Sequence, residues 1–292
     1  MNAAEVITFL RSRLILQRAA TLLTVWSNCL AGWWLGGGDR FDELPLLFAG
    51  AGLLYLGGTF WNDAFAISAG EENGRGPSGS PGARALSVKQ GRGLGLLAVG
   101  VVCLFWLGDV AGWLGLALTV LVIVAQVLRR LASFATVLPP VCRLMLYLIG
   151  ASAGVIGVAG GPIWCGLALA IYILGAHYLV RQKDALGPER HWPILLLAVP
   201  ICLALIVDDD GARAAGLLLS AVLALWTARC LRPALWSDER DFEGALAGLV
   251  AGIVLVDLLA VADAPKPISA VFIGLFLATR ALQNMGSGQV IR

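Results

Sequence analysis

The chain has 292 residues, of which 59% are hydrophobic and only 14% are charged, and its formal net charge is +2. A soluble globular protein of this length needs more polar residues than this to cover its surface. The composition therefore excludes a soluble globular domain and predicts an integral membrane protein.

Ten apolar runs follow one another along the chain, and most are long enough to cross a hydrocarbon core roughly 30 Å thick. They cover approximately residues 15–37, 45–68, 92–108, 111–128, 140–159, 162–180, 193–207, 212–230, 244–262 and 267–285. The first run is longer than the apolar part of a signal peptide, so we expect it to be a true span. Runs of this length are helices rather than barrel strands. We therefore predict an all-α polytopic transmembrane bundle of nine to ten spans, built as a single domain over 1–292.

The distribution of Lys and Arg between the connections supports this count. Ten spans divide the connections into two sets, one of which holds seventeen basic residues and the other only Arg40, Arg213 and Lys266. We expect the protein in the inner (plasma) membrane. Because basic residues concentrate on the cytoplasmic side, both termini are expected in the cytoplasm. The segments 69–91 and 181–192 are expected as cytoplasmic loops.

Small residues are frequent inside the apolar runs, as in "GASAGVIGVAGG" at 150–161. Glycine in membrane helices lets two backbones approach closely, so we expect these residues to serve helix packing. The six cysteines also lie in apolar runs and form no CxxC pair, which predicts neither a disulfide framework nor a zinc site.

Polar residues inside membrane spans are costly and are therefore the candidates for function. They are Asn28, Asn62, Asp63, Gln126, Arg143, Tyr147, His177, Tyr178, Arg181, Asp257, Gln283 and Asn284. Most lie toward the cytoplasmic ends of their spans, which predicts a cavity facing the cytoplasm. Asp257 is the exception, because it lies about one turn from the outer end of its span, and we expect it to reach the outer interface.

Several short motifs accompany these residues. Asn62 and Asp63 open "NDAFAISAGEE" at the end of the second run, "PSGS" follows at 77–80, and "ALSVKQGRGLGLL" begins at 85. The sixth run ends in "RQKDALGPER" at 181–190. Together they resemble the UbiA superfamily of intramembrane prenyltransferases, and "VCRLMLYLIGASAG" at 141–154 is most similar to its EboC branch, whose members belong to a bacterial secondary-metabolism cluster. The resemblance covers nearly the whole chain in topology but only these short motifs in residues.

The resemblance implies a polyprenyl diphosphate donor, bridged by Mg²⁺ to carboxylates of an NDxxDxxxD motif. Asn62 and Asp63 match that motif, whereas Ala66 and Gly70 stand at its other acidic positions. Glu71 would substitute if the helix reached it, although Gly70 favours a helix end before it. In the second motif Lys183 and Asp184 match, while Pro188 replaces the next carboxylate.

The resemblance thus assigns roles to particular residues. It implies that Asp63 and Asp184 are catalytic and that both, with Glu71, hold Mg²⁺. It implies substrate-binding roles for Asn28, Asn62, Arg143, Tyr147, Arg181 and Lys183. Arg143 is also explained by its position, because an arginine near the end of a span can extend to the interface.

Two functions of different class remain open. The first is transfer of a prenyl chain from a polyprenyl diphosphate to a hydrophobic acceptor, aromatic or lipidic, with lipid and no nucleic acid as further partners. The second is a non-catalytic UbiA-like membrane protein that binds, presents or helps export a hydrophobic metabolite, and the missing carboxylates at 66 and 70 favour it. An ion-coupled transporter is disfavoured, because the central spans lack paired charges and broken helices.

Overall fold

The computed structural model describes residues 3–72, 81–128, 132–181, 191–206, 213–236 and 240–288. Over these ranges the chain is helical and contains no strand. The helices are α1 (Ala3–Leu35), the short 3-10 helix η1 (Phe41–Glu43), α2 (Leu44–Glu72), α3 (Pro81–Leu107), α4 (Asp109–Leu128), α5 (Ala132–Ser152), α6 (Gly160–Arg181), α7 (Pro193–Ile206), α8 (Arg213–Leu235), α9 (Phe242–Ala260) and α10 (Lys266–Gly288).

Six of these helices are long and apolar enough to cross a membrane. The qualifying segments lie in α2, α3, α6, α8, α9 and α10, and shorter apolar segments lie in α4, α5 and α7. The prediction of an all-helical protein with several membrane-spanning helices is confirmed at this level.

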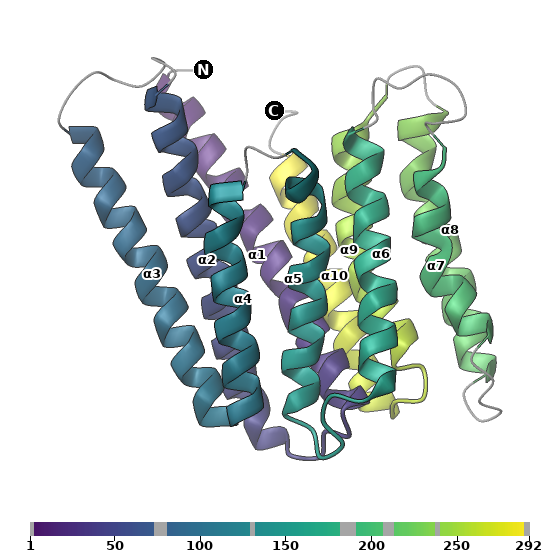
Figure 1. The fold of residues 1–292 in the computed structure, drawn as a ribbon. Helices are drawn as coiled ribbons and strands as arrows, with labels where there is room; N and C mark the ends of the chain where they lie inside the picture. Colours follow the sequence, from purple (N-terminus) through teal and green to yellow (C-terminus); the bar gives the residue numbers. More distant parts are fainter. Residues whose placement is uncertain are drawn as a thin grey trace.

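The helices run side by side between two ends of the bundle (Figure 1). α1 begins and α10 ends at the same end, which we call the terminal end. The other end, which we call the opposite end, carries η1 and the connections from α5 to α6 and from α9 to α10.

α1 occupies the centre of the bundle. It packs against α5 and α10 most extensively and also contacts α2, α6 and α9. α2, α3 and α4 form a group on one side of it, while α6, α7, α8 and α9 pack together on the other. Figure 1 shows the two groups on either side of the central helices.

Glycines set the distance between α1 and α5. Gly32 of α1 and Gly36, directly after its end, lie against Tyr147 and Ala151 of α5. Gly150 of α5 and Gly154, just beyond its end, lie in turn against Cys29 and Gly36. A Cβ at Gly32 would collide with the carbonyl oxygen of Tyr147, and one at Gly150 would collide with that of Cys29. The two backbones therefore approach as closely as small residues permit, which confirms the expected packing role for Gly150 and Gly154. It is not borne out for Gly157, Gly160 and Gly161, where a Cβ would meet no atom within 4 Å.

Several helix bounds differ from those expected. α5 begins at Ala132 and contains Pro139 and Pro140 in its interior, a position that membrane helices tolerate better than soluble ones. Arg143 is consequently near the middle of its helix rather than near one end. α2 continues through Gly70 to Glu72, and α3 begins at Pro81, where a proline suits the first turn. The segment 69–91 is therefore helical at both ends and not a single loop.

Candidate functional site

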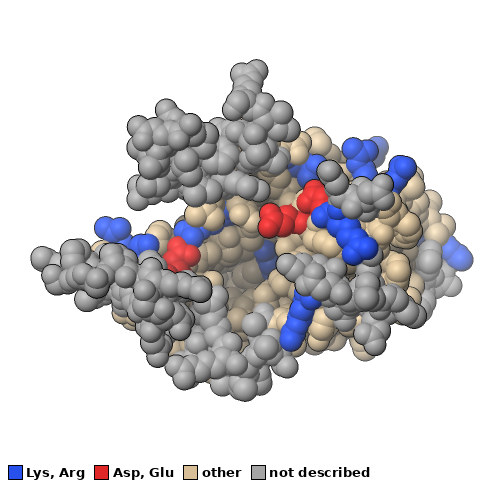
Figure 2. All heavy atoms as spheres, turned by 90° about the horizontal axis from the view of Figure 1, so that it is seen from above, with Lys and Arg blue, Asp and Glu red and all other residues tan. Residues whose placement is uncertain are grey.

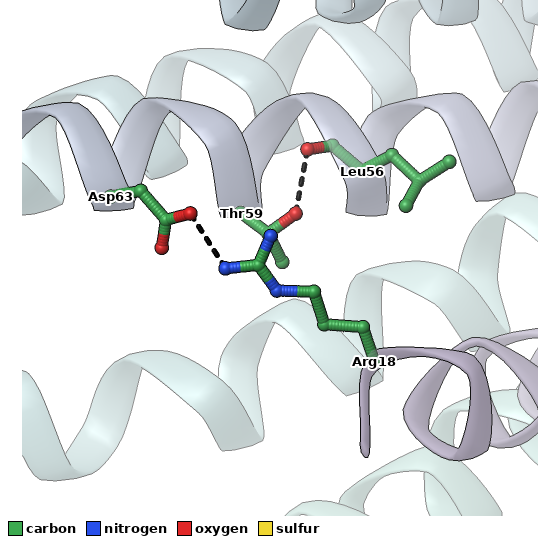
Figure 3. Close-up of polar contacts among 4 residues, drawn as sticks. All are labelled: Arg18, Leu56, Thr59 and Asp63. Atoms are coloured by element: carbon green, nitrogen blue, oxygen red, sulfur yellow. Dashed lines mark hydrogen bonds and ion pairs between the residues drawn. The ribbon is translucent and has the colours of Figure 1, made fainter. Parts of the chain in front are cut away.

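An ion pair joins α1 to α2 in the half of the bundle nearer the terminal end. Arg18 Nη2 donates to Asp63 Oδ2 at 2.6 Å, and the two side chains are 32% and 35% exposed. Figure 3 shows the Arg18 guanidinium extending from α1 to Asp63 and passing beside Thr59. Thr59 Oγ1 donates to the carbonyl oxygen of Leu56 in its own helix. The pair is held between two helices and is still partly accessible.

The terminal end is hollowed. Figure 2 shows a depression on this face, with acidic and basic side chains around it and Lys or Arg atoms visible in its depth. Asn62, directly before Asp63, is partly buried on the same helix. A hollow with charges on its walls is what the expected cavity requires, although the side of the membrane that it faces is not given by the fold.

The second motif is described only at its beginning. Arg181 is exposed at the end of α6, where its Nη1 donates to Thr136 Oγ1 of α5 at 2.9 Å. Lys183 and Asp184 lie outside the described residues, as does the side chain of Glu71. The expected convergence of Asp63 with Asp184 therefore concerns residues that the structure does not describe.

The described residues alone do not form the Mg²⁺ site that the resemblance implies. No group of three or more His, Cys, Asp or Glu side chains within the described ranges is placed to hold a metal ion. Asp63 is the motif carboxylate that is described, and its Oδ2 accepts from Arg18. Mg²⁺ usually needs one or two carboxylates together with substrate phosphates, and a guanidinium bound to the carboxylate competes with it. In the structure, the cation that contacts the Asp63 carboxylate is the Arg18 guanidinium.

A second polar cluster, which we call the Asp257 layer, lies deeper in the bundle. It consists of Ser27, Asn28, Arg143, Tyr147 and Asp257, from α1, α5 and α9. Asp257 is fully buried and accepts hydrogen bonds from Ser27 Oγ, from Asn28 Nδ2 at 2.8 Å and from Tyr147 Oη at 2.8 Å. A buried carboxylate requires such donors, so these bonds stabilise it.

Arg143 completes the layer. Its Nη1 donates to Asn28 Oδ1 at 2.8 Å, so the Asn28 amide bridges the guanidinium and the Asp257 carboxylate. The partly buried guanidinium and the buried carboxylate are thus linked through Asn28, and their opposite charges offset each other inside the bundle.

The Asp257 layer bears on the expectation that Asp257 reaches the outer interface and on the suggestion that Arg143 extends to an interface. Asp257 does not reach the outer interface, because its exposure is 0% and its partners come from two other helices. Arg143 likewise contacts Asn28 and does not extend to an interface.

The expected site residues that the structure describes divide into two groups. Asn62 and Asp63 of α2 and Arg181 at the end of α6 lie toward the terminal end, whereas Asn28, Arg143 and Tyr147 belong to the Asp257 layer. Along α1, Arg18 and Asn28 are ten residues apart, which is about 15 Å at 1.5 Å per residue.

Sequence reasoning missed Arg18 and the partnership of Asp257 with Arg143. In the sequence, Arg18 is only one of the seventeen basic residues that orient the protein. A charge-balance argument would have found the second pair, because Arg143 and Asp257 each lie alone in an apolar run. No protein-family model, curated protein or solved structure matches this chain.

Proposed function

We propose that this protein is a UbiA-like membrane prenyltransferase that moves a prenyl chain from a polyprenyl diphosphate to a hydrophobic acceptor. The observation that carries the proposal is the partly exposed Arg18–Asp63 pair, which includes the Asp of the Asn-Asp motif. The hollow at the terminal end supports it, because the pair lies in the half of the bundle nearer that end.

The proposal includes a topology. Nine to ten of the helices span the inner membrane, and both termini face the cytoplasm. The excess of basic residues on the connections of one side supports this orientation. The hollow at the terminal end would then open to the cytoplasm, where a soluble diphosphate head group is accessible.

In the reaction, the bond between the first prenyl carbon and the diphosphate oxygen breaks, and its electron pair leaves with the diphosphate. The acceptor forms a new bond to that carbon and releases a proton. Negative charge develops on the leaving diphosphate, and donors held in place before the reaction stabilise such charge most effectively. Arg18 supplies a guanidinium whose donor geometry suits phosphate oxygens, and Asp63 holds it in place. The apolar helices surround the chain and exclude water.

One observation favours the alternative, a UbiA-like protein that binds or presents a hydrophobic metabolite without catalysis. The Asp63 carboxylate is occupied by Arg18, and the described residues contain no metal-binding group. A guanidinium–carboxylate pair binds an anionic head group without requiring turnover.

Turnover separates the two functions. The full chain, purified in detergent, is incubated with geranyl diphosphate or longer polyprenyl diphosphates and a panel of aromatic and lipidic acceptors, with and without Mg²⁺, and diphosphate release is measured. The proposal expects release that Asp63→Asn and Asp184→Asn abolish and that Asp109→Asn, at the opposite end of the bundle, leaves unchanged. Binding of the diphosphates without release would favour the alternative, and absence of both would exclude the two functions together.

A further inference from the structure

A pocket lies at the opposite end of the bundle, away from the Arg18–Asp63 pair. Its volume is about 560 Å³, within the range of roughly 300–1,000 Å³ typical of small-molecule sites. It lies between α1, α6, α7, α8 and α9, and its walls include Leu35, Trp164, Pro200 and Leu259. Most of its lining is apolar, so it suits a hydrocarbon chain.

The depth of the pocket matches one leaflet of a bilayer. Its lining begins at Asp263, in the turn after α9, and extends to Ala168 on α6. Ala168 is eight residues from the first residue of α6, Gly160, which corresponds to about 12 Å along the helix axis. Half of a hydrocarbon core is about 15 Å thick. A chain in the pocket would therefore occupy the leaflet at the opposite end, with its head group at the rim.

The rim carries both signs of charge. Arg213, the first residue of α8, and Asp263, in the turn after α9, both line the pocket and are exposed. A guanidinium is complementary to a phosphate, and a carboxylate is complementary to an ammonium group. Charge complementarity therefore favours a head group that carries both charges.

We propose that this pocket binds one zwitterionic phospholipid, phosphatidylethanolamine, from the leaflet at the opposite end. One acyl chain fills the apolar pocket, the phosphate faces Arg213 and the ammonium group faces Asp263. The site does not depend on the proposed prenyl transfer, because none of its lining residues belongs to the Arg18–Asp63 pair or to the Asp257 layer.

Two glycines offer positions at which a larger side chain could be introduced into the pocket without a collision with the protein. Gly161 on α6 and Gly216 on α8 both line the pocket, and a Cβ at either position would have no atom within 4 Å. Phenylalanine at either position would place its ring in the space that the chain needs. Gly274 on α10 is the matched control, since a Cβ there also has no neighbour within 4 Å and the residue does not line the pocket.

The test is native mass spectrometry of the purified full chain with added palmitoyl-oleoyl phosphatidylethanolamine or phosphatidylglycerol. We expect one phosphatidylethanolamine to remain bound to the wild type and to Gly274→Phe. Gly216→Phe and Gly161→Phe should each weaken this binding by about tenfold or more, because each displaced methylene loses its burial. Asp263→Asn should reduce the preference for phosphatidylethanolamine over phosphatidylglycerol.

Three results would overturn the proposal. The first is unchanged lipid retention by both filled variants with thermal unfolding like that of the wild type. The second is an equal loss of lipid from Gly274→Phe. The third is equal binding of the zwitterionic and anionic lipids by the wild type, which would remove the assigned head group.

Discussion

Asp63 and Asp257 are both carboxylates within helices, yet their surroundings differ. Asp257 is fully buried, accepts from Ser27, Asn28 and Tyr147, and is balanced by Arg143. The Asp63 side chain is 35% exposed, and the side-chain contact described for it is the ion pair with Arg18. The first acid is surrounded by donors of the protein itself, whereas the second remains accessible to a ligand.

This difference assigns separate tasks to the two regions. A buried acid and base that satisfy each other hold α1, α5 and α9 in one arrangement, and the loss of either partner leaves an uncompensated charge. A partly exposed pair contributes less to stability than a buried one and can exchange its partner for another ion. We therefore expect stability to depend on the Asp257 layer and ligand binding to depend on Arg18 and Asp63.

The largest effect is expected for Asp257→Ala. Removal of one partner of a buried charge pair typically costs about 3–5 kcal/mol. Here the three donors lose their acceptor and Arg143 loses its opposite charge. Thermal unfolding of the purified protein in detergent measures the loss. Asp39→Ala, in the exposed connection between α1 and η1, is the control and should unfold like the wild type. Equal unfolding temperatures for the wild type and Asp257→Ala would refute the structural role of the layer.

Removal of both charges should restore part of the stability that is lost when one charge is removed. In the double variant Asp257→Leu with Arg143→Met, neither charge remains buried without a partner, and apolar replacements of buried ion pairs are often neutral or stabilising. The double variant should therefore unfold at a higher temperature than either single variant, as a double-mutant cycle would show. Additive losses would mean that Arg143 and Asp257 do not compensate each other.

A smaller loss, about 1–3 kcal/mol, is expected for Gly150→Ala, because the added methyl collides with the backbone of Cys29 and forces α1 away from α5. Gly95→Ala on α3 is the matched control, since no atom would contact its Cβ. Alanine is favoured over glycine in a helix, so the control should be neutral or slightly more stable. Equal effects at the two positions would contradict close packing of α1 and α5.

The smallest effect on stability is expected for Asp63→Asn. Exposed ion pairs contribute about 0–1 kcal/mol, so the unfolding temperature of this variant should be close to that of the wild type. A loss as large as that of Asp257→Ala would show that the Arg18–Asp63 pair is structural and would remove the contrast between the two regions.

The helices themselves could be predicted, because a backbone in lipid must satisfy its own hydrogen bonds and hydropathy locates the runs that do so. The bounds of α5 and α2 could not, since Pro139 and Gly70 are helix breakers in water that the packed helices accommodate. Asn62 and Asp63 are candidates because a carboxylate stands at the end of an apolar run, and their functional role stays a prediction.

The partners of these residues were not visible. Arg18 and Asp63 are 45 residues apart in the sequence, and Ser27 and Asp257 are 230 apart. Such contacts depend on which helices lie side by side, and hydropathy carries no information about that arrangement. The glycines at 32 and 150 contained the missing information for α1 and α5, because their small size permits the close approach that brings Asn28 to Arg143.

The most direct test of the division between the two regions is the affinity of geranylgeranyl diphosphate for Arg18→Met compared with the wild type, measured by isothermal titration calorimetry on the folded proteins. A hydrogen bond to a charged group contributes about 1.5–3 kcal/mol, so the account predicts affinity weakened by roughly tenfold or more with little change in unfolding temperature. An affinity equal to that of the wild type would contradict the assignment of ligand binding to Arg18 and Asp63.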